Sequence, residues 1–210
     1  AKTVNQMISA KIGTNEAARV TCIKPSGTTS LVLGTASGIH AWHNDFYLRT
    51  MRFNKNEDIA VYLMENHPEL CEDDVLRPND TVCVRIPVKA PEGSILRTET
   101  AIDTLERVKH FSTNWIKSGH INGDNTHNVS ATISIDSNKY YFSDFGPDNG
   151  YQFFKEGPLT TSEKIDCAET NEWEAVGWWM WENRESYNGL SVLPYWGGTY
   201  QQAPFEDITE

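Results

Sequence analysis

The sequence lacks the features that would place it in a membrane, in the secretory pathway or on a nucleic acid. No apolar run approaches the roughly 18 residues that a membrane-spanning helix needs. Residues 1–6 show no basic start followed by an apolar stretch, so no secretory signal is predicted. Only 18 Lys and Arg stand against 29 Asp and Glu, which gives a net charge of −11. An acidic surface repels nucleic acids and anionic membranes, so neither is an expected partner.

Cysteine is also scarce, and its spacing excludes two common uses of the residue. The four cysteines, Cys22, Cys71, Cys83 and Cys167, form no Cys-x-x-Cys pair. Their spacing is typical neither of a zinc site nor of a disulfide framework. We therefore expect reduced thiols in a cytoplasmic protein, and we predict no metal site.

The remaining composition supports a folded α/β protein. Hydrophobic residues make up 39% of the chain and charged residues 22%, which is enough apolar material for a core. Strands and helices alternate, which predicts parallel β/α units in one domain, residues 1–210, with an irregular excursion at about 136–170. The helix expected over 171–184 is dense in tryptophan, and its spacing favours core packing over stacking on a base or sugar. Strands are expected at 19–23, 46–53, 81–87, 128–135 and 190–195, and helices at 3–18, 28–33, 56–65, 100–118 and 171–184.

The turn after residue 23 is the main candidate site. A short β-branched run ends at Pro25, Gly27 permits a tight backbone, and hydroxyl residues then open a helix. The first amides of a helix have no internal partners and carry partial positive charge, which suits an anion. An ordinary Ser/Thr helix cap would give the same local pattern. The substrate-binding candidates are Pro25, Ser26, Gly27, Thr28, Thr29 and Ser30.

Three further residues attract attention for their chemistry. His40 and His43 follow two glycines in the stretch 34–44, and either could serve as a ligand or proton donor. No third ligand is evident, so loop histidines that form hydrogen bonds explain the pattern as well. Tyr195 follows Pro194 at a strand end. It could face a site at the carboxyl edge of a sheet, or it could simply be an aromatic residue at the boundary of the strand.

Taken together, the motifs resemble a known enzyme family. Residues 20–31 (Val-Thr-Cys-Ile-Lys-Pro-Ser-Gly-Thr-Thr-Ser-Leu) with Ser37-Gly38-Ile39-His40 resemble the substrate-phosphate strand–turn–helix of ribonucleotide reductase large chains. Residues 126–134, 189–195 and 198–206 resemble later segments of the same family. The resemblance points most of all to the adenosylcobalamin-dependent (class II) ribonucleoside-triphosphate reductases. It implies the C-terminal part of a ten-stranded α/β barrel of the ribonucleotide reductase or glycyl-radical-like kind.

The resemblance also implies a function, a cofactor and partners. Such enzymes convert ribonucleoside triphosphates to 2′-deoxyribonucleotides for DNA synthesis through a thiyl radical, with adenosylcobalamin as cofactor and a thioredoxin-like protein as reductant. By carry-over, residues 26–29 would bind the substrate phosphates and Pro25 would shape the turn, while Ser30, His40 and Tyr195 are further substrate-site candidates.

The chain also departs from the family pattern. No Asn-x-Cys-x-Glu segment and no terminal cysteine pair is found, so no catalytic residue is assigned. Residues 118–123 are similar to the Asp-x-His-x-x-Gly cobalamin pattern, but Ser118 replaces the Asp and no cobalt ligand is assigned. We expect the chain to need the remaining N-terminal part of the enzyme and to be inactive alone. A diphosphate reductase of another class on the same barrel, a non-catalytic nucleotide-binding module and a degenerate remnant are the alternatives.

Overall fold

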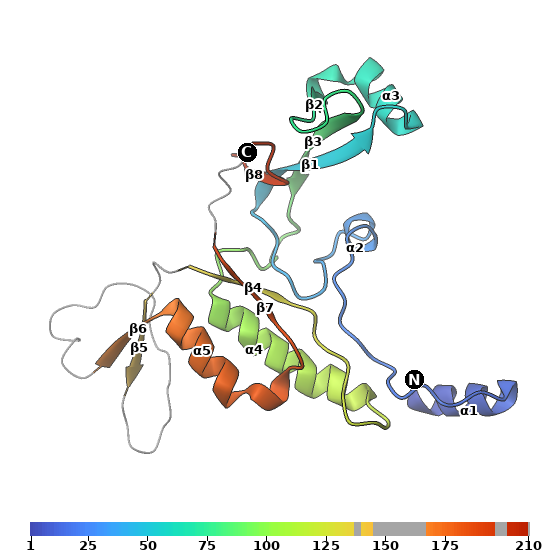
Figure 1. The fold of residues 1–210 in the computed structure, drawn as a ribbon, viewed down its shortest axis with the longest axis vertical. Helices are drawn as coiled ribbons and strands as arrows, with labels where there is room; N and C mark the ends of the chain where they lie inside the picture. The colour runs from blue at the N-terminus through green and yellow to red at the C-terminus, as the bar shows by residue number, and fades with distance from the viewer. Residues whose placement is uncertain (137–139, 145–166, 196–200, 210) are drawn as a thin grey trace. The chain divides into compact units, whose positions relative to one another are not determined.

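The structure is a computed structural model that describes residues 1–136, 140–144, 167–195 and 201–209. The chain is of mixed α/β type and divides into two compact units (Figure 1). Unit 1 comprises residues 1–40 and 99–195, and unit 2 comprises residues 41–98 and 196–210. Within the described ranges, no helix is long and apolar enough to cross a membrane.

Unit 1 is built around two parallel strands covered by two helices. β4 (Thr132–Ile135) pairs with β7 (Ser191–Pro194), and the helices α4 (Ala101–Phe111) and α5 (Glu172–Glu182) lie along them (Figure 1). Side chains alternate along a strand, so Ile133 and Ile135 are buried while Thr132 and Ser134 are exposed. The predicted parallel β/α arrangement is therefore confirmed for this pair. The core consists of Ile39, Ala101, Leu105, Val108, Ile116, Val129, Ala131, Ile133, Ile135, Val176 and Trp179.

Capping residues explain where the two helices begin. The Thr100 hydroxyl accepts a hydrogen bond from the Asp103 amide and the Asp103 carboxylate bonds back, which is a capping box. The Asn171 Oδ1 accepts from the Glu174 amide at 3.0 Å. The predicted helix 100–118 continues beyond α4 as a π-helical turn, Ser112–Ile116, and a 3-10 turn, Lys117–Gly119.

The tryptophan helix corrects one prediction. Only Trp179 is buried, and its indole N–H donates to Glu106 Oε1 at 2.5 Å. Trp173, Trp178 and Trp181 are 43%, 46% and 63% exposed. A helix packed on one side buries only one stripe, so four tryptophans spread around α5 cannot all enter the core.

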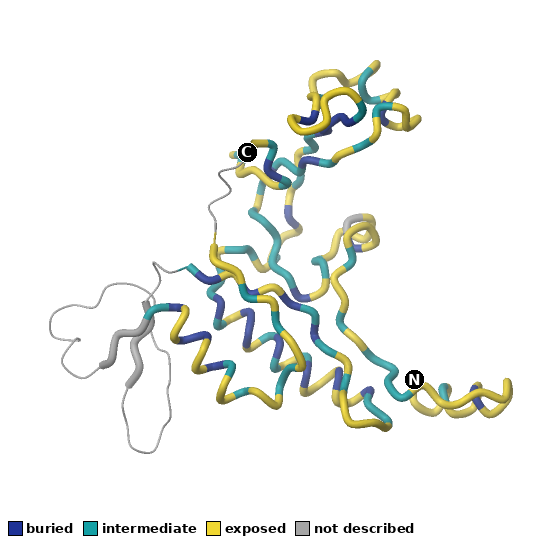
Figure 2. Tube along the Cα trace, viewed as in Figure 1, coloured by how far each residue is buried: buried dark blue, intermediate teal, exposed yellow. Residues whose placement is uncertain are grey.

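The N-terminal helix lies outside that core. α1 (Lys2–Ile12) ends at Gly13, whose φ of 74° is the left-handed conformation that glycine favours at a helix end. Its apolar side chains, Val4, Met7, Ile8 and Ile12, are 48–65% exposed, and the segment is mostly yellow in Figure 2. Asn5 fixes the returning chain, because its amide group both donates to and accepts from the Ala17 backbone at 3.1 Å.

The strand predicted over 19–23 is wrong as a continuous buried strand. Arg19 bridges His120 and Ile23 bridges Val129, but no ladder joins these two points. The Thr21 hydroxyl instead donates to the Trp115 carbonyl at 2.8 Å, and the Val20 amide donates to the Gly119 carbonyl at 2.9 Å. The segment is thus held by the end of the α4 extension rather than by a neighbouring strand. Of the excursion at 136–170, the structure describes the antiparallel pair β5 (Tyr140–Asp144) and β6 (Cys167–Asn171), and 145–166 lie outside the described residues.

Unit 2 is an antiparallel sheet, so the predicted parallel arrangement is wrong here. Its strands lie in the order β2 (Cys71–Asp73), β3 (Thr81–Lys89), β1 (Phe46–Asn54) and β8 (Phe205–Asp207). The chain leaves β1, forms α3 (Asp58–Asn66) and β2, and returns along β3, so the helix is not a crossover between parallel strands. On α3 the buried residue is Ala60, whereas Ile59 and Tyr62 are 50% and 54% exposed.

Candidate functional site

The candidate turn is closed by serine hydrogen bonds. The Ser26 Oγ accepts from the Ser30 amide at 2.9 Å, and the Ser30 hydroxyl donates to the Ser26 carbonyl. Ser37 Oγ donates to the same carbonyl at 3.1 Å. Ser26 therefore caps the helix α2 (Thr29–Val32). An ordinary Ser/Thr helix cap without any ligand would have the same hydrogen bond.

Three consecutive residues on this turn have backbone amides that make no hydrogen bond within the described residues. Gly27, Thr28 and Thr29 are exposed, and within the described part of the chain their amides donate to no acceptor. Successive free backbone N–H groups of this kind attract anions. Because α2 has only four residues, its dipole is small, and any attraction for an anion comes from these local amides rather than from a long helix.

The glycine that shapes the turn is Gly38 rather than Gly27. A Cβ built on Gly27 would meet no atom within 4 Å, and Gly27 does not have a positive φ. Gly38 has a φ of 65°, and a Cβ there would lie 3.3 Å from the Pro25 nitrogen. Gly38 therefore packs on the Lys24–Pro25 peptide.

Both ring nitrogens of His40 hold the loop in place. Its Nε2 accepts from the Thr132 amide at 3.1 Å, and Nδ1 lies 2.9 Å from the Ser37 carbonyl. An acceptor Nε2 requires a neutral ring with its proton on Nδ1, which then donates to Ser37. Arg107, which sequence reasoning missed, secures the same loop by donating to the Ile39 carbonyl at 2.9 Å while it pairs with Glu99. In the sequence, Arg107 is recognisable merely as a basic residue on an amphipathic helix, and nothing there indicates its contact with the loop.

His43 belongs to unit 2, where it takes part in an aromatic cluster. Its ring centroid lies 5.2 Å from that of Phe205 and 5.4 Å from that of Tyr47, and Nε2 lies 3.2 Å from Asp207 Oδ1. Burial, with help from Arg97, lowers the pKa of His43, although Asp207 opposes the change. Within the described ranges, no group of three or more His, Cys, Asp or Glu side chains could hold a metal ion.

Tyr195 lies at the carboxyl ends of β4 and β7. Its amide donates to the Ile135 carbonyl at 2.7 Å, and its side chain is 47% exposed. No hydrogen bond among the described residues joins it to the turn at 24–30, whereas Ser26, Ser30, Ser37 and His40 form one connected set. The residues that follow it, 196–200, lie outside the described residues, and so does the start of the motif at 198–206.

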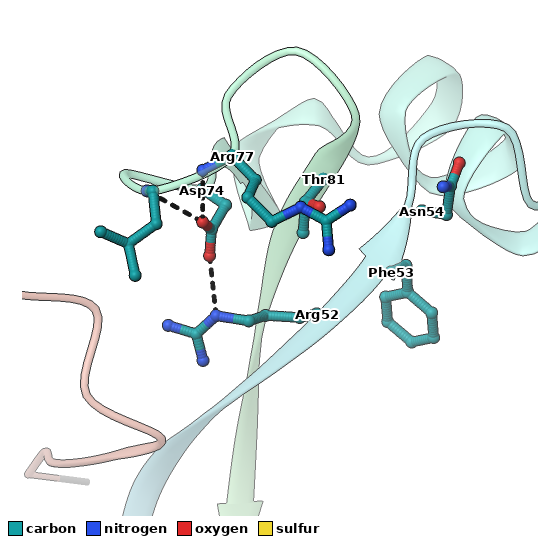
Figure 3. Close-up of a pocket in the computed structure, with 7 residues that line it drawn as sticks. Arg52, Phe53, Asn54, Asp74, Arg77 and Thr81 are labelled. Carbon is teal, nitrogen blue, oxygen red and sulfur yellow. Dashed lines mark hydrogen bonds and ion pairs between the residues drawn. The ribbon is translucent and has the colours of Figure 1, made fainter.

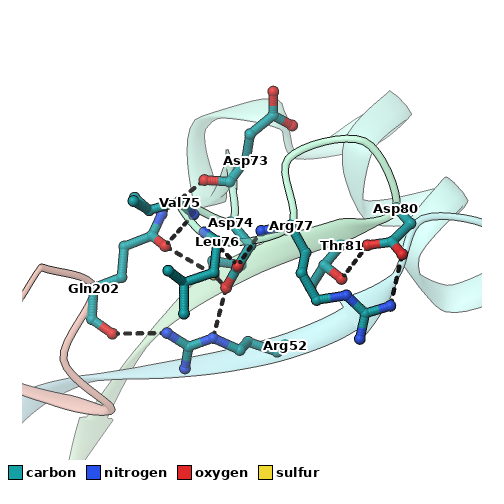
Figure 4. Close-up of polar contacts among 10 residues, drawn as sticks. Arg52, Asp73, Asp74, Val75, Leu76, Arg77, Asp80, Thr81 and Gln202 are labelled. Atoms are coloured by element: carbon teal, nitrogen blue, oxygen red, sulfur yellow. Dashed lines mark hydrogen bonds and ion pairs between the residues drawn. The ribbon is translucent and has the colours of Figure 1, made fainter.

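Unit 2 contains a pocket of about 330 Å³ beside the loop that follows β2 (Figure 3). At its edge the buried Asp74 carboxylate receives Arg52 Nε at 2.7 Å and the amides of Leu76 and Arg77 at 3.0 and 2.9 Å (Figure 4). Gln202, from the end of the chain, accepts from the Val75 amide at 2.9 Å. These contacts attach the last described residues of the chain to the loop.

Asp74 should make the stability of the protein depend on pH in the acid range. The Arg52 hydrogen bond lowers the pKa of Asp74 from its ordinary 3.8 to about 2. A lowered carboxyl pKa contributes stability above about pH 4 that is lost as the pH falls towards 2. We expect urea unfolding midpoints between pH 4 and 2 to fall less steeply for Asp74→Asn than for the parent. If the midpoints of the two proteins fell equally steeply with pH, Asp74 would not be the group responsible. The control is Asp58→Asn, which changes an exposed carboxylate in the same unit.

Comparisons with known proteins place these features in a family context. The chain is 31% identical over 198 residues to an adenosylcobalamin-dependent ribonucleoside-triphosphate reductase of Euglena gracilis, covering 91% of this chain and 21% of that protein. It is 26% identical over 215 residues to the enzyme of the same name from Lactobacillus leichmannii, and the match covers 97% of this chain and 22% of that protein. No known family profile matches the chain.

A solved structure shares the fold. A crystal structure of a B-12 dependent (class II) ribonucleotide reductase matches the whole chain with a TM-score of 0.64 and 23% identity, over 24% of its own length. The chain spans about a fifth of the length of the curated relatives that it matches. The resemblance to ribonucleotide reductase large chains is thus confirmed, and the relatives extend it along nearly the whole chain.

Proposed function

We propose, from its relationship to the adenosylcobalamin-dependent ribonucleotide reductases, that this chain is a segment of such an enzyme and that its turn at 26–29 binds the substrate phosphates. The complete enzyme would reduce ribonucleoside triphosphates to 2′-deoxyribonucleotides for DNA synthesis in the cytoplasm. The proposed partners are the remaining N-terminal part of the enzyme and a thioredoxin-like reductant. In this proposal the segment is a C-terminal part of a ten-stranded barrel and is inactive alone.

The three free amides of Gly27, Thr28 and Thr29 are the observation that carries the proposal. Their N–H groups have no acceptor among the described residues, and the space above Gly27 is open. Phosphate oxygens are strong acceptors that would satisfy all three. The hydroxyls of the two threonines add donors at the same place. Ser26 would act mainly by fixing the turn, because its Oγ already accepts from the Ser30 amide.

The other predicted residues would have supporting roles. Pro25, packed on Gly38, would set the direction of the turn, and Ser30 would close it. His40 would join the turn to β4 through Thr132 rather than exchange protons with a substrate, because both of its ring nitrogens are engaged. Tyr195 remains a proposed lining residue at the carboxyl ends of the two parallel strands.

The described residues do not provide a recognisable place for the cofactor that the relatives require. His120 directs Nε2 to the Gly123 carbonyl at 2.9 Å, and its Nδ1 is buried. No metal-binding cluster is found in the part of the chain that the structure describes. We therefore assign none of these residues to adenosylcobalamin, which the complete enzyme would bind elsewhere.

Gly27→Glu should weaken triphosphate binding strongly, whereas Gly27→Gln should preserve most of it. Both side chains enter open space, so both variants should fold, and only glutamate places a negative charge against the phosphates. We expect the parent chain to bind ATP and inorganic tripolyphosphate, with NMR shifts at the amides of 27–29. The glutamate variant should bind at least about tenfold more weakly.

The same titrations can contradict the proposal. If the two Gly27 variants bind ATP equally, or if the shifts occur away from the turn, the phosphate-binding role is wrong. Binding of adenosine without phosphates at equal strength would contradict it too. Tighter binding of ADP than of ATP would favour the diphosphate reductase alternative.

A further inference from the structure

The pocket in unit 2 has the size of a small-molecule site and a mixed lining. Its volume of about 330 Å³ is at the lower end of the roughly 300–1,000 Å³ that such sites occupy. Residues from the end of β1, the loop after β2 and the start of β3 surround it (Figure 3). They are Arg52, Phe53, Asn54, Asp74, Leu76, Arg77 and Thr81.

Asp74, the one carboxylate among the described residues that line this pocket, has little acceptor capacity to spare. Asp74 Oδ1 receives the amides of Leu76 and Arg77, and Oδ2 receives Arg52 Nε (Figure 4). The Cys83 thiol lies 3.5 Å from Oδ2 and 3.6 Å from Gln202 Oε1, so these two acceptors share its one proton. Three N–H donors already occupy most of the roughly four acceptor positions of a carboxylate. A ligand rich in donors would therefore find little free acceptor capacity in Asp74.

Donor groups, in contrast, remain available. Arg77 uses only Nη2, which donates to Asp80 Oδ2 at 2.6 Å, and its Nε and Nη1 have no acceptor in the described part of the chain. Asn54 Oδ1 accepts from the Asn56 amide at 2.9 Å, while its Nδ2 likewise has no acceptor there. The open hydrogen-bonding capacity of the pocket is thus donor capacity. It includes most of a guanidinium fork, which suits planar and tetrahedral oxyanions.

The position of Arg77 is partly fixed before any ligand arrives. Its backbone amide is bound to Asp74 and its guanidinium contacts Asp80, which reduces the conformational entropy that binding would cost. Phe53 and Leu76 add apolar surface to the lining, and Leu76 is 89% exposed. An exposed leucine beside free donors fits a ligand with an anionic head and an apolar body.

We propose that this pocket binds a small organic oxyanion, with a phosphate or carboxylate group on Arg77 and Asn54 and an apolar ring against Phe53 and Leu76. Nothing in this proposal depends on the turn at 26–29, which belongs to unit 1. The two sites can therefore be tested independently in the same chain.

The first test is an NMR titration of the complete 210-residue chain with three ring compounds. Phenyl phosphate and benzoate carry the two candidate oxyanions, and benzyl alcohol carries none. We expect saturable shifts at the Asn54 side-chain amide and the Leu76 and Arg77 backbone amides with at least one of the two anions. The tighter of them identifies the head group. The proposal is overturned if neither anion gives saturable shifts at these positions, or if benzyl alcohol binds as tightly as both.

The second test uses substitutions matched in charge. Arg77→Met should weaken binding by about tenfold or more, because charge-assisted hydrogen bonds are lost. Lys89→Met, which removes an equal charge outside the pocket, should change it less than twofold. Because Leu76 is exposed, Leu76→Glu and Leu76→Gln should both fold, and only the glutamate should weaken binding strongly. Equal binding by the Arg77 and Lys89 variants, or by the two Leu76 variants, would contradict the assignment.

Discussion

Replacing Gly119 by alanine should lower the free energy of unfolding by about 3 kcal/mol, the upper end for an overpacked contact. A Cβ at this position would lie 1.8 Å from Thr21 Oγ1 and 2.6 Å from Thr21 Cβ and Cγ2. Thr21 cannot easily withdraw, because its hydroxyl donates to the Trp115 carbonyl and its own carbonyl lies 2.9 Å from His127 Nδ1. The substitution should therefore displace the segment 19–23 that leads into the candidate turn.

A double-mutant cycle isolates this contact. Thr21→Gly removes all three atoms that the new methyl group would strike, so the Gly119→Ala cost should fall to within about 1 kcal/mol in that background. Urea unfolding followed by tryptophan fluorescence gives the free energies. Gly177→Ala, on the exposed side of α5 with no atom near the added Cβ, is the control and should be neutral or stabilising. An undiminished cost in the Thr21→Gly background would show that the steric explanation is wrong.

Sequence pattern was sufficient for several elements whose formation depends on local signals. The strand over 46–53 became β1, the helix from residue 100 began at a capping box, and the run at 190–195 became β7. Each depends on alternation, helical spacing or a cap, all of which a short window of sequence contains. The parallel direction of β4 and β7 agrees with the predicted β/α alternation, although the pairing of these two strands was not itself predicted.

Long-range pairing is what the sequence could not reveal. β8 pairs with β1 across more than 150 residues, and Gln202 reaches the loop after β2 from a left-handed φ of 57°. Nothing near residue 202 indicates either contact. The run 19–23 has strand composition but bonds to the α4 extension. In that case tertiary contacts overrode a local preference.

The candidate site was likewise predicted only in part from the sequence. The resemblance located the turn and its serines, but the assignment of roles needed coordinates. Gly38, not Gly27, makes the close backbone approach, and the position of His40 depends on Thr132, which is 92 residues away. The free amides of 27–29 could be expected from a helix start, yet their availability follows from Ser26 binding only the Ser30 amide.

Replacing Glu172 by alanine should have the largest effect on stability, about 4 kcal/mol. Glu172 is 1% exposed, its Oε1 accepts from the Ala101 amide at 3.0 Å, and its Oε2 accepts from the Asp136 amide at 2.5 Å. Ala101 is the first residue of α4 and Asp136 follows β4, so one carboxylate joins three elements of the core. Its removal deletes two charge-assisted hydrogen bonds and leaves the buried Ala101 amide without this acceptor, at a cost of about 1–3 kcal/mol for each bond lost. A negative charge at the start of both helices also favours their dipoles.

Matched variants separate this role from a general effect of substitution in α5. Glu172→Gln keeps one carbonyl acceptor but turns an NH₂ group towards the other amide, so its cost should fall between that of alanine and zero. Glu182→Ala, exposed on the last turn of the same helix, should change the free energy of unfolding by less than about 0.5 kcal/mol. Hydrogen exchange adds a local readout, because the amides of Ala101 and Asp136 should lose protection before the rest of unit 1. If Glu172→Ala cost less than about 1 kcal/mol, or if these amides stayed protected, the carboxylate would not be what holds α4, β4 and α5 together.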